Sequence, residues 1–350
     1  MKKLLEFKTK AFISLSILLI SIASTVSAQE KIAIIDAGSS GSRLWVYEVS
    51  LQNGAINEIY KKGGGPALSS IRTDSVYQFL QSITKDTGME GNGNEIPLYV
   101  LATAGMRMIP KKADSIYSIM NRLNEDHRKF NGCFKLHTAM TISGRYEGFY
   151  AWLAANAKAG NLEVKNKKLA YHQQYKTIGI LEIGGASMQI AYLAKDDCVV
   201  DTISREKLGC IYSKSYLHYG ADQIFDRLGT QLETSCLAQS LDRINKLHND
   251  NMHFIGLSMP IRTLFESATH QGPFSDIKIK SYIETKHKER QYDCRDNYHP
   301  ATNAVFIDWV VNQLNLNDKL YKPDNASDWT EGAALDIIIN NKQPEAFNNN

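Results

Sequence analysis

The chain has 350 residues, of which 43% are hydrophobic and 22% are charged, and it contains only 8 prolines. This composition is apolar enough for a substantial buried core, and it excludes disordered, collagen-like and fibrous chains. At roughly 150 residues per domain, the length predicts about two globular units.

The first 28 residues are typical of a cleaved secretory signal peptide. A basic start with four lysines precedes an apolar run over residues 11–22, and small residues at 26–28 precede Gln29. The alternative, an uncleaved membrane anchor, would need roughly 20 apolar residues, which this run does not have. We therefore expect a secreted or periplasmic protein without a stable membrane anchor.

Removal of the signal peptide changes the charge of the chain. The formal net charge of the full chain is +3, and residues 1–28 carry four lysines and one glutamate. The mature chain is therefore formally neutral, which gives no support to nucleic acid or anionic lipid as a partner. A monomer is the expected state.

Strand and helix patterns alternate along the mature chain. Five β-branched or aromatic runs that end in small or polar residues are predicted to be strands, at residues 31–36, 42–49, 96–103, 176–183 and 188–193. Apolar residues at helical spacing are found at 114–130, 143–160, 220–232 and 329–339. This alternation predicts an α/β fold.

An internal repeat links two of these regions. Residues 32–47 (IAIIDAGSSGSRLWVY) align with residues 178–192 (IGILEIGGASMQIAY), so that Asp36 falls on Glu182 and Gly38 on Gly184. Each copy consists of a strand, a tight glycine turn and a second strand. The repeat predicts two related lobes, each presenting an acid and a polar backbone loop.

The first copy carries the segment DAGSSGSR, residues 36–43. Its glycines let a ligand approach the backbone, and its N–H groups and serine hydroxyls can bind an anion. It is not a P-loop, because no lysine follows and the next element is a strand. A single turn of this kind is more often an ordinary hairpin, but its repetition favours two opposed phosphate-binding loops.

Acidic residues near these loops are candidates for metal binding and water activation. Asp36 and Glu182 each end the first strand of a copy, and their oxygens suit Mg²⁺ or Ca²⁺ bound together with phosphates. Taken singly, either acid could instead cap its own turn. Glu147, in the first turn of a helix that Ser143 can cap, is a candidate base, although the helix dipole alone favours an acid there.

Five motifs resemble, in order, the five apyrase conserved regions of the GDA1/CD39 family of nucleoside triphosphate diphosphohydrolases. They are DAGSSGSR (36–43), ATAGMR (102–107), SGRYEGFYAW (143–152), LEIGGASMQI (181–190) and DWTEGAAL (328–335). SYLHYGAD (215–222) is similar to a further family segment. The resemblance implies a two-lobed actin/hexokinase-like (ribonuclease H-like) α/β fold with the active site in the interlobe cleft. We expect lobe I at 29–155 plus 325–347 and lobe II at 156–324.

The resemblance also implies a role for each matching residue. Glu147 matches the general base, and Ser187 and Gln189 match the residues that position the attacking water. Asp36 and Glu182 match the acids that bind the metal through water. The residues implied for phosphate binding are Ser39, Ser40, Gly41, Ser42, Arg43, Thr103, Gly184, Gly185 and Ala186.

Two departures from the family pattern concern the metal and the nucleobase. The fourth region usually has aspartate where this chain has Glu182, which is one methylene longer, so the preferred ion stays open among Mg²⁺, Ca²⁺ and Mn²⁺. Where many relatives have aromatic residues that stack on the base, this chain has SMPIR at 258–262. The planar guanidinium of Arg262 is the candidate to stack instead.

Five cysteines occur in a chain that is directed to an oxidising space, where disulfides are permitted. The resemblance implies a bridge between Cys236 and Cys294 in the second lobe. Cys198 and Cys210 are close enough in sequence for a second bridge, which leaves Cys133 as the remaining thiol. Alternatively, some of the five are small buried hydrophobic residues.

The expected function is metal-dependent hydrolysis of terminal phosphate from extracytoplasmic nucleoside triphosphates, with diphosphates as further candidate substrates. Water activated by Glu147 attacks without a covalent intermediate. Two alternatives remain, namely an exopolyphosphatase on the same fold and a nucleotide-binding module without turnover. The presence of Glu147, Ser187 and Gln189 disfavours the second alternative.

Overall fold

The computed structural model describes residues 29–89, 95–172, 176–194, 210–223, 253–257, 259–269, 272–290, 300–322, 327–344 and 346. The predicted signal peptide and three of the cysteines, Cys198, Cys236 and Cys294, lie outside these residues. Within the described ranges, no helix has both the length and the apolar character needed to cross a membrane.

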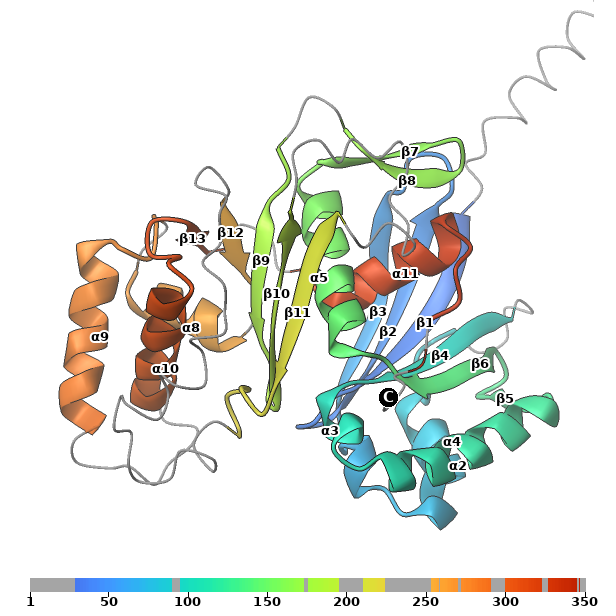
Figure 1. Ribbon diagram of the computed structural model, residues 1–350. Helices are drawn as coiled ribbons and strands as arrows, with labels where there is room; N and C mark the ends of the chain where they lie inside the picture. The colour runs from blue at the N-terminus through green and yellow to red at the C-terminus, as the bar shows by residue number, and fades with distance from the viewer. Residues whose placement is uncertain are drawn as a thin grey trace, which may run out of the picture.

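A six-stranded sheet forms the centre of the first lobe (Figure 1). Its order is β3-β2-β1-β4-β6-β5, and its strands are β1 Gln29–Ala37, β2 Ser42–Ser50, β3 Ile56–Gly65, β4 Ile96–Ala102, β5 Lys129–Phe130 and β6 Phe134–Thr141. Because side chains alternate along a strand, Ile32 and Ile34 of β1 enter one apolar core and Ala33 and Ile35 enter the core on the opposite face.

The second sheet repeats this arrangement. Its order is β11-β10-β9-β12-β13, and its strands are β9 Gly179–Ile183, β10 Ser187–Leu193, β11 Ile211–Leu217, β12 Phe254–Gly256 and β13 Leu320–Tyr321. In both sheets the first two strands form an antiparallel hairpin, and the first strand is also parallel to the next strand along the sheet. The two sheets confirm the predicted α/β fold with two lobes.

Helices cover both faces of the first sheet. On one face lie α2 Val76–Ile83 and α4 Pro110–Glu125, and on the other lie α5 Gly144–Lys158 and α11 Trp329–Ile339. The second lobe contains α8 Met259–Ser267, α9 Ile277–Arg290 and α10 Pro300–Gln313. The remaining short elements are η1 Leu68–Ser70, η2 Thr73–Ser75, α3 Ala104–Arg107, β7 Leu162–Lys165 and β8 Lys168–Tyr171.

Helix α5 lies between the two sheets and is buried on almost every side (Figure 1). Ser143 caps it as expected, since its hydroxyl accepts a hydrogen bond from the backbone N–H of Tyr146 at 3.3 Å. Trp152 on this helix shares one apolar core with Ile180 of the second sheet and with α11. A methyl group on Gly332 of α11 would collide with the carbonyl oxygen of Tyr150, so only glycine allows the two helices to lie this close.

One predicted helix has different bounds in the structure, and another lies only partly within the described residues. The helix expected at 114–130 begins at Pro110, a residue suited to the first helical turn. It ends at Glu125, and His127 then takes a positive φ of 51°. The helix expected at 220–232 can be compared only up to residue 223, and residues 221–223 form a turn.

Two of the five cysteines are described. Cys133 is buried in the apolar core between the first sheet and α4. Cys210, at the start of the second lobe's edge strand, is disulfide-bonded. The pairing of Cys236 with Cys294 stays a prediction.

Candidate active site

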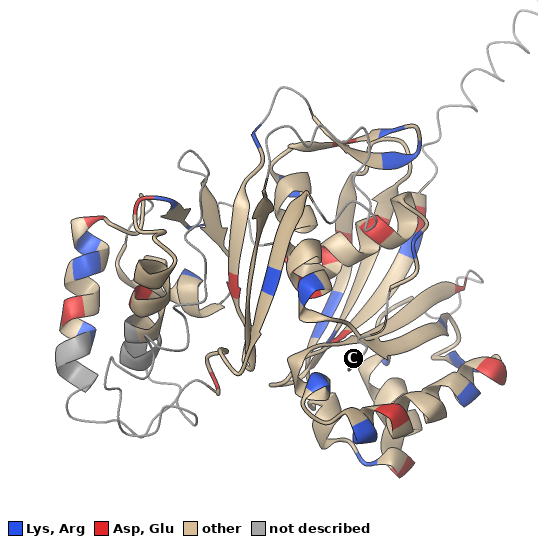
Figure 2. Cartoon of the chain, in the orientation of Figure 1, with Lys and Arg blue, Asp and Glu red and all other residues tan. Residues whose placement is uncertain are grey.

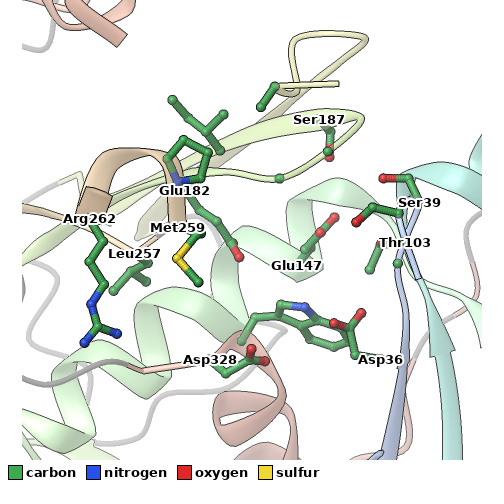
Figure 3. A pocket seen from close by; sticks show the side chains of 18 of the residues that line it. Asp36, Ser39, Thr103, Glu147, Glu182, Ser187, Leu257, Met259, Arg262 and Asp328 are labelled. Carbon is green, nitrogen blue, oxygen red and sulfur yellow. The ribbon is translucent and has the colours of Figure 1, made fainter. Parts of the chain in front are cut away.

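A cavity of about 660 Å³ lies between the two lobes (Figure 3). Its walls come from the β1–β2 and β9–β10 hairpins, the first turn of α5 and the start of α11. The expected site residues that line it are Asp36, Ser39, Ser40, Arg43, Thr103, Glu147, Glu182, Gly184, Gly185, Ala186, Ser187 and Arg262. The fold therefore brings residues from distant parts of the sequence to one place.

The two glycine hairpins approach each other closely at this cavity. A Cβ atom added to Gly185 would lie 2.8 Å from Oγ of Ser39 on the opposite hairpin. On its other side, Ser39 is backed by Gly105, where an added Cβ atom would lie 2.9 Å from Cα of Ser39. Residues without side chains are required at both positions for the loops to meet in this way.

Residues 218–222 hold the second hairpin loop from behind. The carbonyl oxygens of all three loop residues, 184–186, accept hydrogen bonds of 2.8 Å from backbone N–H groups of this segment. A methyl group on Gly220 would collide with the backbone of Gly185. These contacts fix the peptide planes of the loop, and they give the 215–222 motif a structural role that its sequence does not reveal.

Carboxylates are frequent in the cavity lining, and those of Asp36, Glu147, Glu182 and Asp328 lie around its centre (Figure 3). Burial raises the pKa of Asp36 to about 8, and the negative charge of Asp328 adds to this, whereas Arg43 opposes it from 3.1 Å. Burial likewise raises the pKa of Glu182 well above its ordinary value, reinforced by the negative charge of Glu147. Much of the negative charge in this cavity is therefore not compensated by neighbouring cations.

The carboxylates fit a divalent cation. Oε2 of Glu182 is buried and has no hydrogen-bond partner among the described residues. A hard ion with a preference for oxygen ligands would remove the cost of burying this charge. In the described part of the chain, no group of three or more His, Cys, Asp or Glu side chains lies close enough together to hold an ion. The buried oxygen of Glu182 without a partner is therefore the observation that fits a bound cation.

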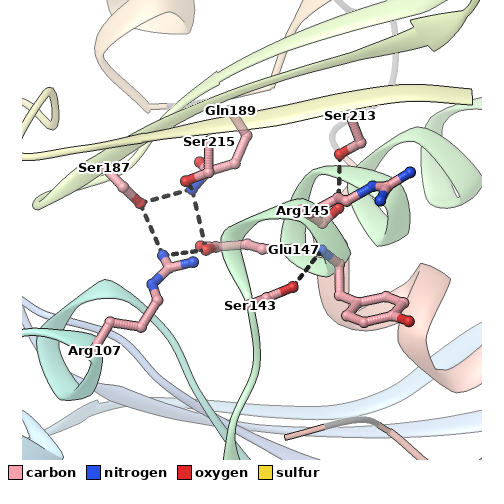
Figure 4. A network of polar contacts seen from close by, with 9 residues as sticks. Arg107, Ser143, Arg145, Glu147, Ser187, Gln189, Ser213 and Ser215 are labelled. Carbon is pink, nitrogen blue, oxygen red and sulfur yellow. Dashed lines mark hydrogen bonds and ion pairs between the residues drawn. The ribbon is translucent and has the colours of Figure 1, made fainter. Parts of the chain in front are cut away.

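Glu147 belongs to a buried polar network that connects α3, α5 and β10 (Figure 4). Nη2 of Arg107 donates to Oε2 of Glu147 at 2.7 Å, and Nε2 of Gln189 donates to the same oxygen at 3.0 Å. Both nitrogens also donate to Oγ of Ser187, at 3.2 Å and 2.6 Å. Burial raises the pKa of Glu147, and the positive charge of Arg107 works against this rise.

Three of the expected site residues lie behind the cavity wall. Gly41 and Ser42 do not line the cavity, and the buried hydroxyl of Ser42 donates to the carbonyl oxygen of Pro66 at 2.8 Å. Gln189 is fully buried, and its amide nitrogen is also 3.2 Å from Oγ of Ser215. The geometry therefore favours Ser39 and Ser40 over Gly41 and Ser42 for phosphate contact, and it favours an indirect role for Gln189.

Two residues that the sequence reasoning did not assign complete the site. Arg107 ends the ATAGMR motif, and its side chain is only 3% exposed. Asp328 accepts the N–H of Thr330 at 3.0 Å as the N-cap of α11, and it also lines the cavity. Both lie in recognised motifs, which is a usable signal, but their partners are distant in sequence and appear only in the fold.

The second-lobe wall of the cavity is largely apolar. Leu257, Met259 and Tyr282 line it together with Arg262, and Met259 is 74% exposed. Nε of Arg262 is 3.0 Å from Oε1 of Glu266, one helical turn further along α8. Arg262 is therefore placed on the wall of the cavity, and its stacking on a nucleobase stays a prediction.

Comparisons with known proteins agree with this arrangement. A family model described as the GDA1/CD39 (nucleoside phosphatase) family matches residues 24–256. The human protein "Ectonucleoside triphosphate diphosphohydrolase 7" is 31% identical over 185 residues, which cover 45% of this chain and 30% of that protein. The chain spans less than half the length of the curated relatives that it matches.

Solved structures share the fold at low sequence identity. A nucleoside triphosphate hydrolase from Neospora caninum has a TM-score of 0.61 at 12% identity, over 95% of this chain and 97% of that chain. A Ppx/GppA family member from Aquifex aeolicus has a TM-score of 0.57 at 14% identity, over 90% and 100%. These likenesses confirm the expected two-lobed fold.

The family model spans most of the chain, and all five recognised motifs contribute residues to the cavity wall. The second of them, ATAGMR, contributes Thr103 to the wall and Arg107 behind it. Members of this family generally depend on a divalent cation. The chain belongs to the GDA1/CD39 (nucleoside phosphatase) family.

Proposed function

We propose that the chain hydrolyses the terminal phosphate of nucleoside triphosphates and diphosphates in a cation-dependent reaction. The observation that carries this proposal is the convergence of two glycine hairpins and the carboxylate of Glu147 on one cavity. A polyphosphate could be held there from both lobes, with its last phosphorus beside Glu147. Family membership and the name of the human relative support nucleotides as the substrate class.

Phosphate oxygens would be held by both hairpins. On the first, the hydroxyl groups of Ser39 and Ser40 and the charge of Arg43 are available at the cavity wall, next to Thr103. On the second, the backbone N–H groups of Gly185 and Ala186 take this role, because the N–H of Gly184 already donates to the carbonyl oxygen of Ser187 at 2.9 Å. Residues 218–222 already fix the peptide planes of this loop. Donors that are in place before the substrate arrives need no rearrangement as charge develops during the reaction.

Water would be activated by Glu147. Its carboxylate accepts a proton from the attacking water as that water approaches the terminal phosphorus in line with the bond that breaks. Ser187 orients the same water, and Gln189 supports both side chains from behind. The leaving group is the shortened nucleotide, and no bond forms between the protein and the phosphate.

Asp36 and Glu182 would hold a divalent cation through water molecules. When bound, the ion offsets negative charge on the phosphate oxygens and on the buried carboxylates. Glu182 extends one methylene further than the aspartate usual in the family, so the choice among Mg²⁺, Ca²⁺ and Mn²⁺ depends on this residue.

We also propose that the protein acts outside the cytoplasm, with residues 1–28 removed, and that lobe I comprises 29–155 plus 325–347 and lobe II 156–324. The sequence pattern of the first 28 residues and the disulfide-bonded state of Cys210 support export. Mass spectrometry of the exported protein is expected to find Gln29 at its N-terminus.

A phosphate-release panel tests the proposed activity. It compares nucleoside tri-, di- and monophosphates with long-chain polyphosphate, each with Mg²⁺, Ca²⁺ or Mn²⁺. We expect turnover of tri- and diphosphates and none of monophosphates. Preference for long-chain polyphosphate would favour an exopolyphosphatase, and nucleotide binding without phosphate release would favour a binding module.

The Glu147→Gln variant tests the proposed base. It is expected to lose at least about 100-fold in kcat while still binding nucleotide, because a positioned base contributes roughly 10²- to 10⁴-fold. Glu125→Gln, at the exposed end of α4, is the matched control and should retain full activity. Full activity of Glu147→Gln would remove Glu147 from its role.

A further inference from the structure

We propose that Arg107 is a positioning residue that determines which atoms of Glu147 and Ser187 face the substrate. This inference rests on the proposed function of those two residues, but Arg107 itself does not line the cavity. Its guanidinium is buried behind the wall, in contact with Glu147, which lies 40 residues further along the chain (Figure 4).

The hydrogen bonds to Glu147 leave one of its oxygens for the cavity. Oε2 accepts from Arg107 at 2.7 Å and from Gln189 at 3.0 Å. A carboxylate oxygen has two lone pairs, so these two donors occupy Oε2. Oε1 is therefore the oxygen that can accept a proton from a water molecule in the cavity.

The hydrogen bonds to Ser187 have a complementary effect. A hydroxyl group has two lone pairs and one hydrogen. Arg107 and Gln189 both donate to Oγ of Ser187, since neither a guanidinium nor an amide nitrogen can accept a hydrogen bond. The hydroxyl hydrogen must therefore point elsewhere, and because Ser187 lines the cavity, it is available to a water molecule there.

Together these constraints place a hydrogen-bond donor and an acceptor side by side at the cavity wall. Water bound between them accepts a hydrogen bond from Ser187 and donates one of its hydrogens to Oε1 of Glu147. One lone pair of that water is then left for the phosphorus. Without Arg107, the hydroxyl of Ser187 would be able to turn toward Glu147 and occupy the base.

Arg107 also supplies a positive charge next to Glu147, which has several other acidic side chains around it. Glu147 is near Asp328 of α11, Glu182 of β9 and Asp36 of β1. Among the described residues, Arg107 is the cation within hydrogen-bond distance of Glu147. Burial favours the neutral form of Glu147, so the charge of Arg107 favours the ionised form that can accept a proton.

The local sequence is adapted to this contact. A methyl group on Gly144, in the first turn of α5, would collide with Nη1 of Arg107 and with the side chain of Ser215. One turn later, an added Cβ atom on Gly148 would lie 2.7 Å from Oγ of Ser213. The two glycines on either side of Glu147 therefore make room for the guanidinium and for the serines of β11.

Kinetics over a range of pH test the proposal, with Arg107→Met and Arg107→Lys compared with the wild type between pH 5.5 and 9. Arg107→Met should lower kcat about 100-fold at pH 7 while KM changes less than about threefold. It should also shift the acid limb of the kcat profile upward by more than about one pH unit, because Glu147 then ionises at higher pH. Arg107→Lys keeps the charge on a shorter side chain, so it should lose activity without this shift.

Arg145→Met is the matched control. Arg145 lies on the same turn of α5 as Glu147, but it is exposed and its side chain extends away from the network (Figure 4). Its removal deletes the same charge near the site and should change kcat by less than about twofold. An equal pH shift in Arg145→Met would show that net charge, and not the buried contact, controls Glu147.

Thermal unfolding of the cation-free protein gives a readout that does not depend on turnover. A group whose pKa is raised in the folded protein loses its stabilising contribution as the pH rises through that pKa. Arg107→Met should therefore lose more Tm between pH 5 and pH 8 than the wild type does. A second substitution, Glu147→Gln, should remove this extra loss.

The two readouts separate failure of this inference from failure of the proposed function. Two kinetic results for Arg107→Met would overturn the positioning role. One is an acid limb of the kcat profile at the same pH as in the wild type. The other is an equal loss of kcat at every pH together with a raised KM. If the wild type releases no phosphate from any substrate, the proposed function fails and the unfolding measurements still decide whether Arg107 keeps Glu147 ionised. If Arg107→Met does not fold, Arg107→Lys and the Arg107→Met/Glu147→Gln double variant provide the same comparison.

Discussion

The β1–β2 and β9–β10 hairpins have the same backbone plan but offer a ligand different groups. In each, the next-to-last residue of the first strand is an acid, a glycine turn follows, and a serine begins the second strand. The first hairpin presents the side chains of Ser39 and Ser40, and Arg43 pairs with its acid at 3.1 Å. The second presents mainly backbone, and its acid, Glu182, has a buried oxygen without a partner among the described residues.

The serines that begin the second strand of each hairpin, Ser42 and Ser187, differ in what their side chains contact. Ser42 donates its hydroxyl to the carbonyl oxygen of Pro66, just after β3, and takes no part in the cavity wall. Ser187 lines the cavity and accepts hydrogen bonds from Arg107 and Gln189. An internal repeat thus determines the position of a residue on its strand, whereas the neighbouring elements determine what its side chain does.

The largest loss of activity is expected from Gly220→Ala, which should displace the second hairpin and leave the first unchanged. An added methyl group would push on the backbone of Gly185 and move a loop that contacts phosphate through its main chain. Because a shift of about 1 Å in a positioning element can cost about 100-fold in rate, we expect kcat/KM to fall by about that factor.

Gly63→Ala is the matched control for Gly220→Ala. Nothing lies within 4 Å of a Cβ atom added at Gly63, on the strand next to the first hairpin. Phosphate release and Tm should therefore stay at their wild-type values. Equal losses in both variants would mean that the close approach of residue 220 to the second loop does not matter.

A smaller and more selective effect is expected from removing the two equivalent hydroxyl groups. Ser187→Ala should lower kcat about 10- to 100-fold, because the water loses the group that orients it. Ser42→Ala should leave kcat unchanged and lower the unfolding free energy by about 1 kcal/mol, because a buried hydrogen bond is lost. Steady-state kinetics and denaturant unfolding of both variants check this, and a loss of kcat in Ser42→Ala would restore Ser42 to the phosphate site.

The smallest effect is expected from neutralising the two acids in the cation-free protein. The folded pKa of Asp36 is about 8 and that of Glu182 is raised well above normal, so the unfolding free energy should fall as the pH rises from about 4 to 8. Glu182→Gln should reduce this fall, because it removes a buried group whose pKa is raised. Asp36→Asn should reduce it less, since Arg43 already compensates Asp36.

Urea unfolding at pH 5 and pH 8 measures this difference between the two acids. Arg128→Met, whose ion pair with Asp126 is solvent-exposed, is a control that should leave the pH dependence unchanged. Identical slopes for Glu182→Gln and Asp36→Asn would show that the two hairpins bury their acids at the same cost.

Much of the fold could be predicted from the sequence because it depends on local patterns. Strand alternation, the repeat and the cap at Ser143 place β1, β2, β9, β10 and α5 close to their observed positions. The start of α4 at Pro110 was missed, because the apolar spacing begins later than the helix does. Local patterns indicate where an element lies better than where it ends.

The candidate site could be predicted less completely, because contacts between distant segments determine it. The sequence identifies Glu147 and both loops, but it does not reveal that Arg107 reaches Glu147 across 40 residues. For the same reason it gives no sign that Pro66 takes the hydroxyl of Ser42, or that Gln189 is enclosed by Ser187 and Ser215. Each of these outcomes depends on a third element that the repeat does not contain.

Helix α11 supplies Asp328 to the cavity and lies against α5 at Gly332, yet it comes almost 300 residues after β1 begins at Gln29. A polypeptide that emerges from the ribosome one residue at a time therefore carries both hairpins long before it carries the last wall of the pocket. Truncation ahead of Trp329 would leave the apolar flank of α5 open to solvent and the pocket unfinished. The pocket therefore cannot be complete before the final segment has been synthesised and has packed against α5.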